Sequence, residues 1–354
     1  MLLKNLKVIE LSSVLAGPLV GTFFAELGAK VIKVENKRTG GDVTRTWRLP
    51  SESPDNPVSA YYASANFGKE CLFLDYSVDD DYQLLIKLVK DADIVLVNFK
   101  PGDAEKFNLT YQDLEKIKPD LIYAAITGFG EDDPRIAFDV VLQAETGFMS
   151  MNGEPESLPL KMPLAMIDIF AAHQLKEGIL CALIERQVSG KGAHVKVSLF
   201  DAAVTSLANQ AANFLMNHHD PKAIGSIHPN IAPYGELFKT ADHHYIVLAV
   251  GNDKQFAQLC KALGAQELMK NPKFSSNPQR VANRKDLHEQ LKSYFTHRAT
   301  VELERLLLQY AVPFGRVRNL NEVFELDNAK KLIHSHTIDG QECLTIKTIG
   351  FSLE

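Results

Sequence analysis

Cysteine is scarce in this sequence, and it is spread too widely to build a disulfide framework or a metal centre. The chain of 354 residues has four cysteines, and no two of them are spaced as a CxxC pair or as zinc ligands. Scattered, unpaired cysteines are typical of a chain kept reduced in the cytoplasm. The sequence therefore predicts no metal site and a cytoplasmic location. The four residues are Cys71, Cys181, Cys260 and Cys343.

Long apolar runs are also missing. The first eleven residues carry Lys4, Lys7 and Glu10 among their apolar side chains, so they lack the uninterrupted apolar core of a signal peptide. The run that begins at Val14 stops at Glu26, and no stretch reaches the roughly 18 uncharged apolar residues of a membrane span. These absences predict a soluble protein without a membrane partner.

No excess of positive charge points to a nucleic-acid partner. The net charge is −6, and it spreads over both halves of the chain without a basic stripe. Apolar residues make up 45% and charged residues 23%, which is typical of a globular protein. Because 354 residues exceed one ordinary compact core, we expect two domains.

Two common enzyme signatures are absent. The sequence has no GxGxxG motif, which disfavours a nicotinamide enzyme even though Glu35 stands where a ribose-binding acid would. The pair Gly225-Ser226 lacks the strand and helix that flank a nucleophile elbow, and no catalytic triad emerges.

What is present is an alternation of short apolar segments with helical patterns. We expect strands at 6–11, 30–35, 71–75, 94–98 and 121–126, with helices that include 18–27 and 79–92 between them. Near-continuous apolar strands in strand–helix–strand order predict a parallel sheet covered on both faces. The fold class is therefore α/β, with a Rossmann-like doubly wound sheet.

A long helix is expected after Met166. Its apolar stripe is expected to face inward, whereas His173, Lys176 and Glu177 fall off the stripe. The stripe consists of Ile169, Ala172, Leu175, Ile179 and Leu183.

The rest of the chain predicts a second domain. A strand at 194–199 and one helix over 201–216 complete the first domain, and 217–233 lacks periodicity, as expected of a crossover. A strand at 245–250 then precedes a helix that places Phe256, Leu259 and Leu263 inward.

Several expected strands end in residues suited to binding a ligand. Ser12–Pro18 is rich in small residues that let a ligand approach the backbone, and the helix that follows could hold a phosphate at its N-terminus. Arg38 lies in a flexible basic loop, and Asn98 and Lys106 flank the end of another strand. Because crevices of open α/β sheets lie at such ends, a binding role is one interpretation. Ordinary turn and solvated-loop chemistry is the other.

Asp168 opens the long helix, and two interpretations of it remain. Aspartate is a preferred N-cap that stabilises a helix by about 1 kcal/mol without any catalytic role. Its apolar surroundings, however, make an uncompensated carboxylate costly there, which favours a chemical role. Asp139 and Asp201 also begin helical patterns and could be caps.

A series of short motifs resembles the family III CoA-transferases, the group that includes formyl-CoA and carnitine-pathway transferases. The motifs are VIELS at 8–12, LAGP at 15–18, LGAKVIKVE at 27–35, NFGK at 66–69, NFKPG at 98–102, ITGFG at 126–130, Asp168, HPNIAPY at 228–234, VGNDKQF at 250–256 and VPFG at 312–315. Each motif alone is weak, but their order along nearly the whole chain is specific.

The resemblance implies a fold and an assembly. It implies a large Rossmann-like CoA-binding domain at 1–218, a small α+β domain at 219–310, and a C-terminal segment at 311–354 that returns toward the large domain. It also implies an interlocked homodimer, whose chains pass through each other like links. The substrates would be an acyl-CoA thioester and a small carboxylic acid, with no permanently bound cofactor.

The resemblance also implies site residues. Asp168 becomes the nucleophile, with Asp139 behind it and Gly251 in a glycine loop of the small domain. The CoA contacts implied are Val14, Leu15, Ala16, Arg38, Asn98, Phe99, Lys106 and Phe107. Attack of the Asp168 carboxylate on the thioester would give a mixed anhydride, with oxyanion donors near Leu15, Ala16 and Gly251. A helix N-terminus is expected to offset the rise in pKa that burial imposes on Asp168.

Departures from the family pattern keep two alternatives open. Leu15 replaces a glutamine of the formyl-CoA enzymes, a single Gly251 replaces a glycine run, and many relatives continue beyond the last residues of this sequence. The α-methylacyl-CoA racemases share the fold, but they place a histidine where this chain has Phe138. A CoA-binding relative without activity is the third hypothesis.

Overall fold

The computed structural model describes residues 2–353, which divide into two compact units. The first unit holds the residues up to Ser150, Leu160–Pro221 and the residues from Lys331 onward. The second holds Met151–Pro159 and Lys222–Lys330. The expected boundaries at 218 and 310 stay a prediction; in this division the second unit continues past 310, because β9 (Phe314–Arg316) pairs with one of its strands. Within the described chain, no helix is long and apolar enough to cross a membrane.

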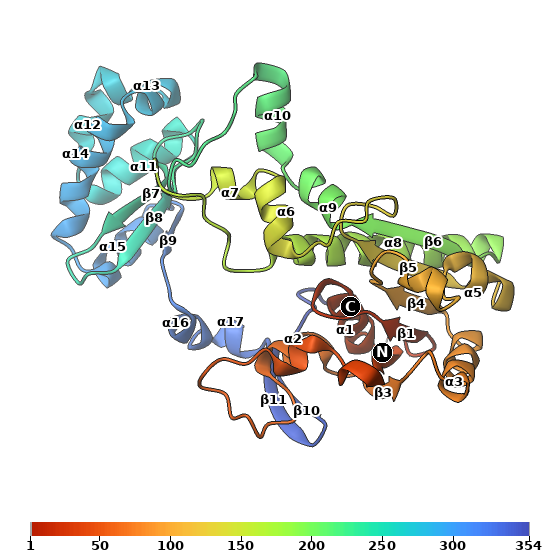
Figure 1. Cartoon of the computed structure of the whole chain (residues 1–354). Coiled ribbons are helices and arrows are strands. Elements are labelled where there is room, and N and C mark those ends of the chain that lie inside the picture. The colour runs from red at the N-terminus through yellow and green to blue at the C-terminus, as the bar shows by residue number, and fades with distance from the viewer. Residues whose placement is uncertain (1, 354) are drawn as a thin grey trace. The chain divides into compact units, whose positions relative to one another are not determined.

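A six-stranded sheet forms the centre of the first unit (Figure 1). Its strand order is β3-β2-β1-β4-β5-β6, and every neighbouring pair is parallel. The predicted parallel sheet is thus confirmed, in the strand order typical of dinucleotide-binding folds. The strands are β1 (Lys7–Leu11), β2 (Lys30–Asn36), β3 (Glu70–Leu74), β4 (Ile94–Val97), β5 (Ile122–Thr127) and β6 (Ala193–Ser198).

Two separate hydrophobic cores cover the two faces of this sheet. Side chains alternate between faces along a strand, so Val8 belongs to one core and its neighbour Ile9 to the other. The core around Val8 includes side chains of α1 (Ala16–Glu26), α8 (Met166–Ser189) and α9 (Leu199–Thr205). The core around Ile9 includes those of α3 (Asp79–Lys90) and α5 (Tyr111–Ile117). The near-continuous apolar strands are explained by this burial on both sides.

Shorter elements complete the first unit. A C-terminal hairpin of β10 and β11 packs against α2 through a small core that includes Tyr62 and Cys343. The elements are η1 (Lys37–Thr39), η2 (Val43–Thr46), α2 (Ala60–Asn66), α4 (Asp103–Lys106), α6 (Asp139–Glu145), α7 (Phe148–Met151), α10 (Ala208–Asn217), β10 (Ile333–Ile338) and β11 (Gln341–Ile346).

Two helical expectations in the first unit were wrong. The single helix expected over 201–216 is two helices, α9 and α10, because Ala208 takes a left-handed φ of 46° that interrupts the right-handed path. Lys176 was expected off the buried stripe of α8, yet it is only 7% exposed. Its ammonium lies 5.1 Å from the centre of the Phe23 ring, which gives the buried charge an attractive partner.

The second unit combines an antiparallel sheet with helices. Its strand order is β7-β8-β9, and the side chains of Phe256, Leu259 and Leu263 on α11 are buried, as predicted. The elements are β7 (Tyr234–Lys239), β8 (Tyr245–Ala249), α11 (Asp253–Leu263), α12 (Gln266–Lys270), η3 (Pro272–Phe274), α13 (Asn277–Ala282), α14 (Arg284–Thr296), α15 (Thr300–Gln309), β9, α16 (Leu320–Phe324) and α17 (Asp327–Lys330).

Gly178 permits the close approach of α8 to β6. A Cβ at this position would lie 2.6 Å from Cγ1 of Val195. An exposed helical Gly→Ala substitution gains up to about 1 kcal/mol, but here we expect Gly178→Ala to lower the free energy of unfolding by about 1–3 kcal/mol, because the added methyl overpacks the core. Urea denaturation measures the change.

The matched control for Gly178→Ala removes the obstructing methyl groups. The double variant Gly178→Ala/Val195→Ala should lose less free energy of unfolding than the sum of the two single variants. The smaller side chain at 195 makes room for the methyl group added at 178, and that methyl group fills part of the space left at 195. Strictly additive losses would contradict the packing argument.

Candidate active site

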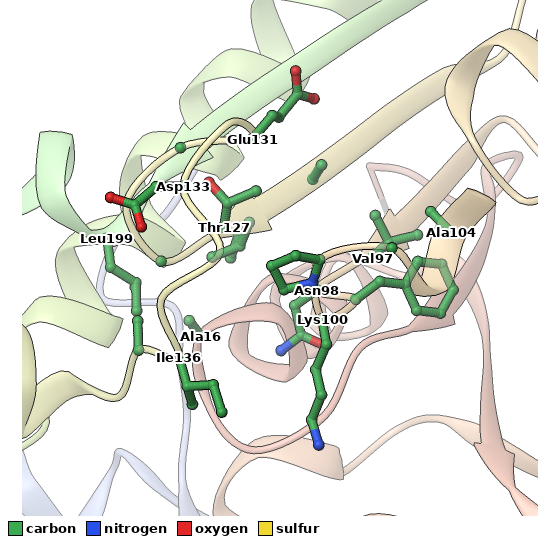
Figure 2. A pocket seen from close by; sticks show the side chains of 18 of the residues that line it. Ala16, Val97, Asn98, Lys100, Ala104, Thr127, Glu131, Asp133, Ile136 and Leu199 are labelled. Carbon is green, nitrogen blue, oxygen red and sulfur yellow. The ribbon is translucent and has the colours of Figure 1, made fainter. Parts of the chain in front are cut away.

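A pocket of about 540 Å³ opens at the carboxyl ends of β1, β4 and β5 (Figure 2). Ser13 and Val14 follow β1, Asn98 follows β4, and Thr127 ends β5, and all four residues line the pocket. In the order 3-2-1-4-5-6 the chain changes direction between β1 and β4, which is where ligands bind in open α/β sheets. The position of the pocket therefore follows from the topology of the sheet.

The loop after β1 is held in a strained shape. Val14 has a φ of 72°, a left-handed conformation that is unusual for a β-branched residue. Its N–H donates to the carboxylate of Asp42, with N–O distances of 3.2 and 3.3 Å. Asn98 accepts the N–H of Ser13 at 2.9 Å and donates to its carbonyl at 2.8 Å. The surroundings thus over-determine the loop, as strained functional segments require.

Helix α1 begins directly after this loop, and its first N–H groups are not capped by a side chain. Leu15 is the residue before the helix, and no side chain caps it within the described residues. The first N–H groups of a helix have no intrahelical acceptor, so they present positive partial charge to a ligand. Leu15 and Ala16 line the pocket, which places these donors at its wall.

Asp168 stands in the first turn of α8 and lines the same pocket. It is the third residue of the helix, so it is not the N-cap, which is Ala165. Only 8% of Asp168 is exposed, and no ion pair to it is found within the described chain. A buried, unpaired carboxylate at a pocket wall is costly, and such groups are typical of functional sites.

Asp139 supplies the cap that Asp168 does not. Its Oδ1 accepts the N–H of Ile167 at 2.7 Å, so it caps α8 from the neighbouring helix α6. Its Oδ2 accepts from Gln143 at 2.6 Å, and Gln143 also bonds to the backbone of Met162 and Leu164 just before α8. The two side chains of α6 therefore fix where the helix of Asp168 begins.

Burial, and to a smaller extent the charge of Asp139, together raise the pKa of Asp168 to about 7. The expected offset by the helix N-terminus was therefore wrong, because burial outweighs it. At neutral pH the carboxylate is close to its titration midpoint.

Tyr61, which sequence reasoning did not identify, also belongs to this neighbourhood. Burial and the charges of Asp168, Asp139 and Asp42 raise its pKa to about 12. The phenol is therefore protonated and able to donate a hydrogen bond among three carboxylates.

The structure brings together some of the predicted site residues and not others. The pocket lining includes Val14, Leu15, Ala16, Asn98, Phe99 and Asp168. Arg38, Lys106 and Phe107 lie outside it: Arg38 is 3.9 Å from Asp75, and Lys106 lies against the ring of Phe107. Gly251 belongs to the second unit, where its N–H donates to Gln255 at 2.8 Å.

Other residues line the pocket that were not predicted as site residues. Figure 2 shows Lys100 beside Asn98, and Glu131, Asp133 and Ile136 on the loop after β5. Tyr111 and His194 also line the pocket and stack at 4.9 Å between ring centres. Lys100 belongs to the NFKPG motif at 98–102, but no motif connects it with the other positions, so only the fold could show their proximity. No group of three or more metal-ligating side chains occurs among the described residues.

A family model described as CoA-transferase family III matches residues 3–354. The chain belongs to CoA-transferase family III. The resemblance found in the sequence is thus confirmed, and with it the activity of an acyl-CoA:carboxylate CoA-transferase.

Relatives of known activity are similar over most of their length. A succinate–glutarate CoA-transferase of Agrobacterium fabrum is 38% identical, over 91% of this chain and 81% of its own. The human succinyl-CoA:glutarate CoA-transferase is 34% identical, over 98% of this chain and 78% of its own. Among solved structures, a CaiB/BaiF family protein from Brucella suis has a TM-score of 0.85 at 38% identity, covering 99% of this chain and 92% of its own.

The buried carboxylate of this family III transferase should cost it stability at neutral pH. Because folding raises the pKa of Asp168 from 3.8 to about 7, the ionised form is penalised in the folded state. Replacing it by a neutral isostere, Asp168→Asn, should raise the free energy of unfolding at pH 8 by at most about 4 kcal/mol. The gain should shrink as pH falls below 7 and vanish near pH 3. Urea denaturation at several pH values measures it.

Asp201→Asn is the matched control, because Asp201 also lies in the first turn of a helix but is exposed. It should show no comparable gain at pH 8. An Asp168→Asn protein no more stable than wild type at pH 8 would contradict the burial cost.

Proposed function

We propose that this transferase moves CoA from an acyl-CoA to a free carboxylic acid through covalent intermediates on Asp168. The observation that carries the proposal is the position of Asp168, a buried carboxylate with no ion-pair partner among the described residues, at the wall of the pocket. A carboxylate suits the reaction because its acyl anhydride and its CoA thioester retain the energy of the starting thioester.

The proposed reaction has four acyl-transfer steps. The Asp168 carboxylate attacks the thioester carbonyl, which forms a mixed anhydride and expels CoA thiolate. The thiolate attacks the Asp168 carbonyl, which forms an aspartyl-CoA thioester and releases the donor acid. The acceptor carboxylate attacks this thioester and regenerates an anhydride and CoA thiolate. The thiolate then attacks the acceptor carbonyl, which yields the new acyl-CoA and free Asp168.

Burial of Asp168 favours acylation in this scheme. The ionised carboxylate bears the cost of lost solvation, as its raised pKa indicates. Acylation converts it to a neutral group and removes that cost. The oxyanion of each addition needs preorganised donors, which we assign to the N–H groups of Leu15 and Ala16.

The remaining CoA contacts stay proposals. Asn98 and Phe99 line the pocket, although the amide of Asn98 already holds the backbone of Ser13. Arg38, Lys106 and Phe107 are proposed to bind the nucleotide end of CoA, beyond the pocket that holds the thioester. We propose no permanently bound cofactor.

A short dicarboxylic acid is the proposed acceptor. Several relatives are named for transferring CoA between a CoA ester and glutarate, mesaconate or oxalate, and each of these acids carries two carboxylates. Lys100 is a cation on the pocket wall with no ion pair among the described residues, and we propose that it attracts such an acid.

We also propose a cytoplasmic location, because the four cysteines are free thiols, as is typical of proteins in a reducing compartment.

Asp168 should carry the acyl group during turnover. Incubation with succinyl-CoA or acetyl-CoA, followed by hydroxylamine, should convert Asp168 to a hydroxamate that peptide mass spectrometry can locate. Asp168→Ala should abolish CoA exchange while leaving CoA affinity largely intact, because the side chain acts mainly in the transition state.

Two other outcomes would contradict this mechanism. Washout of α-deuterium from a 2-methylacyl-CoA without an adduct would support a racemase instead. Binding of CoA with neither adduct nor washout, across a panel of acyl-CoA esters, would support an inactive relative.

We also propose that the protein is a homodimer, interlocked as the resemblance implies. Helix α10 has no buried residue, and Phe214, Leu215 and Met216 on it are 49%, 74% and 79% exposed. An apolar helix without a partner is typical of an interface. A second copy of the chain is the proposed partner.

An interlocked dimer should not dissociate while folded. Light scattering should give about twice the chain mass of 39.3 kDa, and dilution should not reduce it. In urea, the loss of the dimer should coincide with the loss of secondary structure measured by circular dichroism. A folded monomer at any concentration would contradict interlocking.

A further inference from the structure

Lys33 is a buried cation that the proposed mechanism does not use. It lies on β2 with 0% exposure, and its ammonium has three acceptors around it. It donates to Glu10 Oε1 at 3.0 Å and to the carbonyl of Ser12 at 2.8 Å, and it lies 3.0 Å from Asp42 Oδ2. An ammonium has three protons, so this environment satisfies it completely.

The charges around Lys33 favour its ionised form. Burial alone would lower its pKa, but the carboxylates of Glu10, Asp42 and Glu35 raise it above the ordinary value. The other oxygen of Glu10 lies 2.8 Å from Lys69. Two lysines and two carboxylates thus form a closed, buried set directly behind the loop that follows β1.

Asp42 connects this buried set to the pocket. One of its oxygens faces Lys33, the other accepts the N–H and hydroxyl of Thr44, and both accept the N–H of Val14. The Asp42 carboxylate therefore acts only as an acceptor toward Lys33, Thr44 and Val14. Asp42 therefore holds Val14 in its left-handed conformation. That conformation sets the direction in which the chain continues into Leu15.

We propose that Lys33 and Asp42 are positioning residues for CoA transfer, which hold Val14 in its left-handed conformation so that the N–H groups of Leu15 and Ala16 face the thioester oxygen. The proposal rests on the proposed function of Asp168 as nucleophile. Lys33 fixes Asp42 and the carbonyl of Ser12, and Asp42 fixes Val14. Neither side chain lines the pocket, so neither contacts the substrate.

The test is Asp42→Asn, measured as the single-turnover rate of acylation of Asp168 by succinyl-CoA. An asparagine must place an NH₂ group toward either Lys33 or Thr44, which are donors, so the hold on Val14 weakens. We expect acylation to slow roughly 10- to 100-fold, with little change in the KM for the CoA ester. Val14→Gly added to Asp42→Asn should recover part of the rate, because glycine takes left-handed φ without being held.

Asp93→Asn is the matched control at the opposite end of β1. Asp93 also accepts a backbone N–H, that of Lys7 at 2.9 Å, and also pairs with a cation, Arg186 at 2.9 Å. It should leave the acylation rate per folded molecule unchanged. If Asp42→Asn does not fold, Thr44→Val removes only one hydrogen bond to Asp42 and should slow acylation in the same direction.

The outcomes separate this proposal from the mechanism on which it rests. A wild-type protein that forms no adduct on Asp168 would refute the mechanism. A wild-type adduct that forms equally fast in folded Asp42→Asn or Thr44→Val protein would refute the positioning role alone. The positioning role would also be refuted if Asp93→Asn lowered the acylation rate as much as Asp42→Asn does. The same holds if adding Val14→Gly to Asp42→Asn recovered none of the acylation rate.

Discussion

The reciprocal hydrogen bonds between Asn98 and the backbone of Ser13 join the two strand ends between which the pocket opens. β1 and β4 are neighbours in the sheet, but the chain leaves their ends in different directions. A contact between the two ends is therefore needed to fix their relative position. Here one amide side chain supplies both an acceptor and a donor. The loop of Val14 and the start of α1 follow directly after this junction.

Three aspartates near the pocket show how environment assigns a role to the same side chain. Asp42 lies beside a lysine and accepts from backbone N–H groups, and Asp139 caps a helix that is not its own, whereas neither kind of partner is found for Asp168 within residues 2–353. Burial and the charge of Asp139 raise the pKa of Asp168 to about 7. The proposed nucleophile is thus the carboxylate that the fold leaves without a compensating partner among the described residues.

The sequence was most informative where a local pattern decides the structure. The apolar runs predicted the parallel sheet, because strands buried on both faces have no polar alternation. The position of Asp168 at the start of a helix was also evident, but its role was not, since a cap and a nucleophile look alike in a single sequence. Its apolar surroundings favoured a chemical role, and the ordered motifs of the family made the nucleophile the stronger prediction.

What local patterns could not show depends on long-range contacts. The cap of α8 comes from Asp139, 28 residues before Ile167, and no helix signal predicts a cap from another helix. Lys176 was placed outside the core because a charge normally marks a solvated face, whereas the ring of Phe23 accommodates it. Asp42 and Lys33 resembled ordinary loop and strand residues until the fold brought them together.

The division of the chain has a consequence for biosynthesis. Arg45 pairs with Glu35 nearby in the sequence and with Asp339 in the turn of the C-terminal hairpin, 294 residues away. The first unit therefore cannot close around Arg45 until the ribosome has made the whole of the second unit. During that interval α2 lacks its cover from the β10–β11 hairpin, and the nascent chain exposes an apolar surface that chaperones recognise.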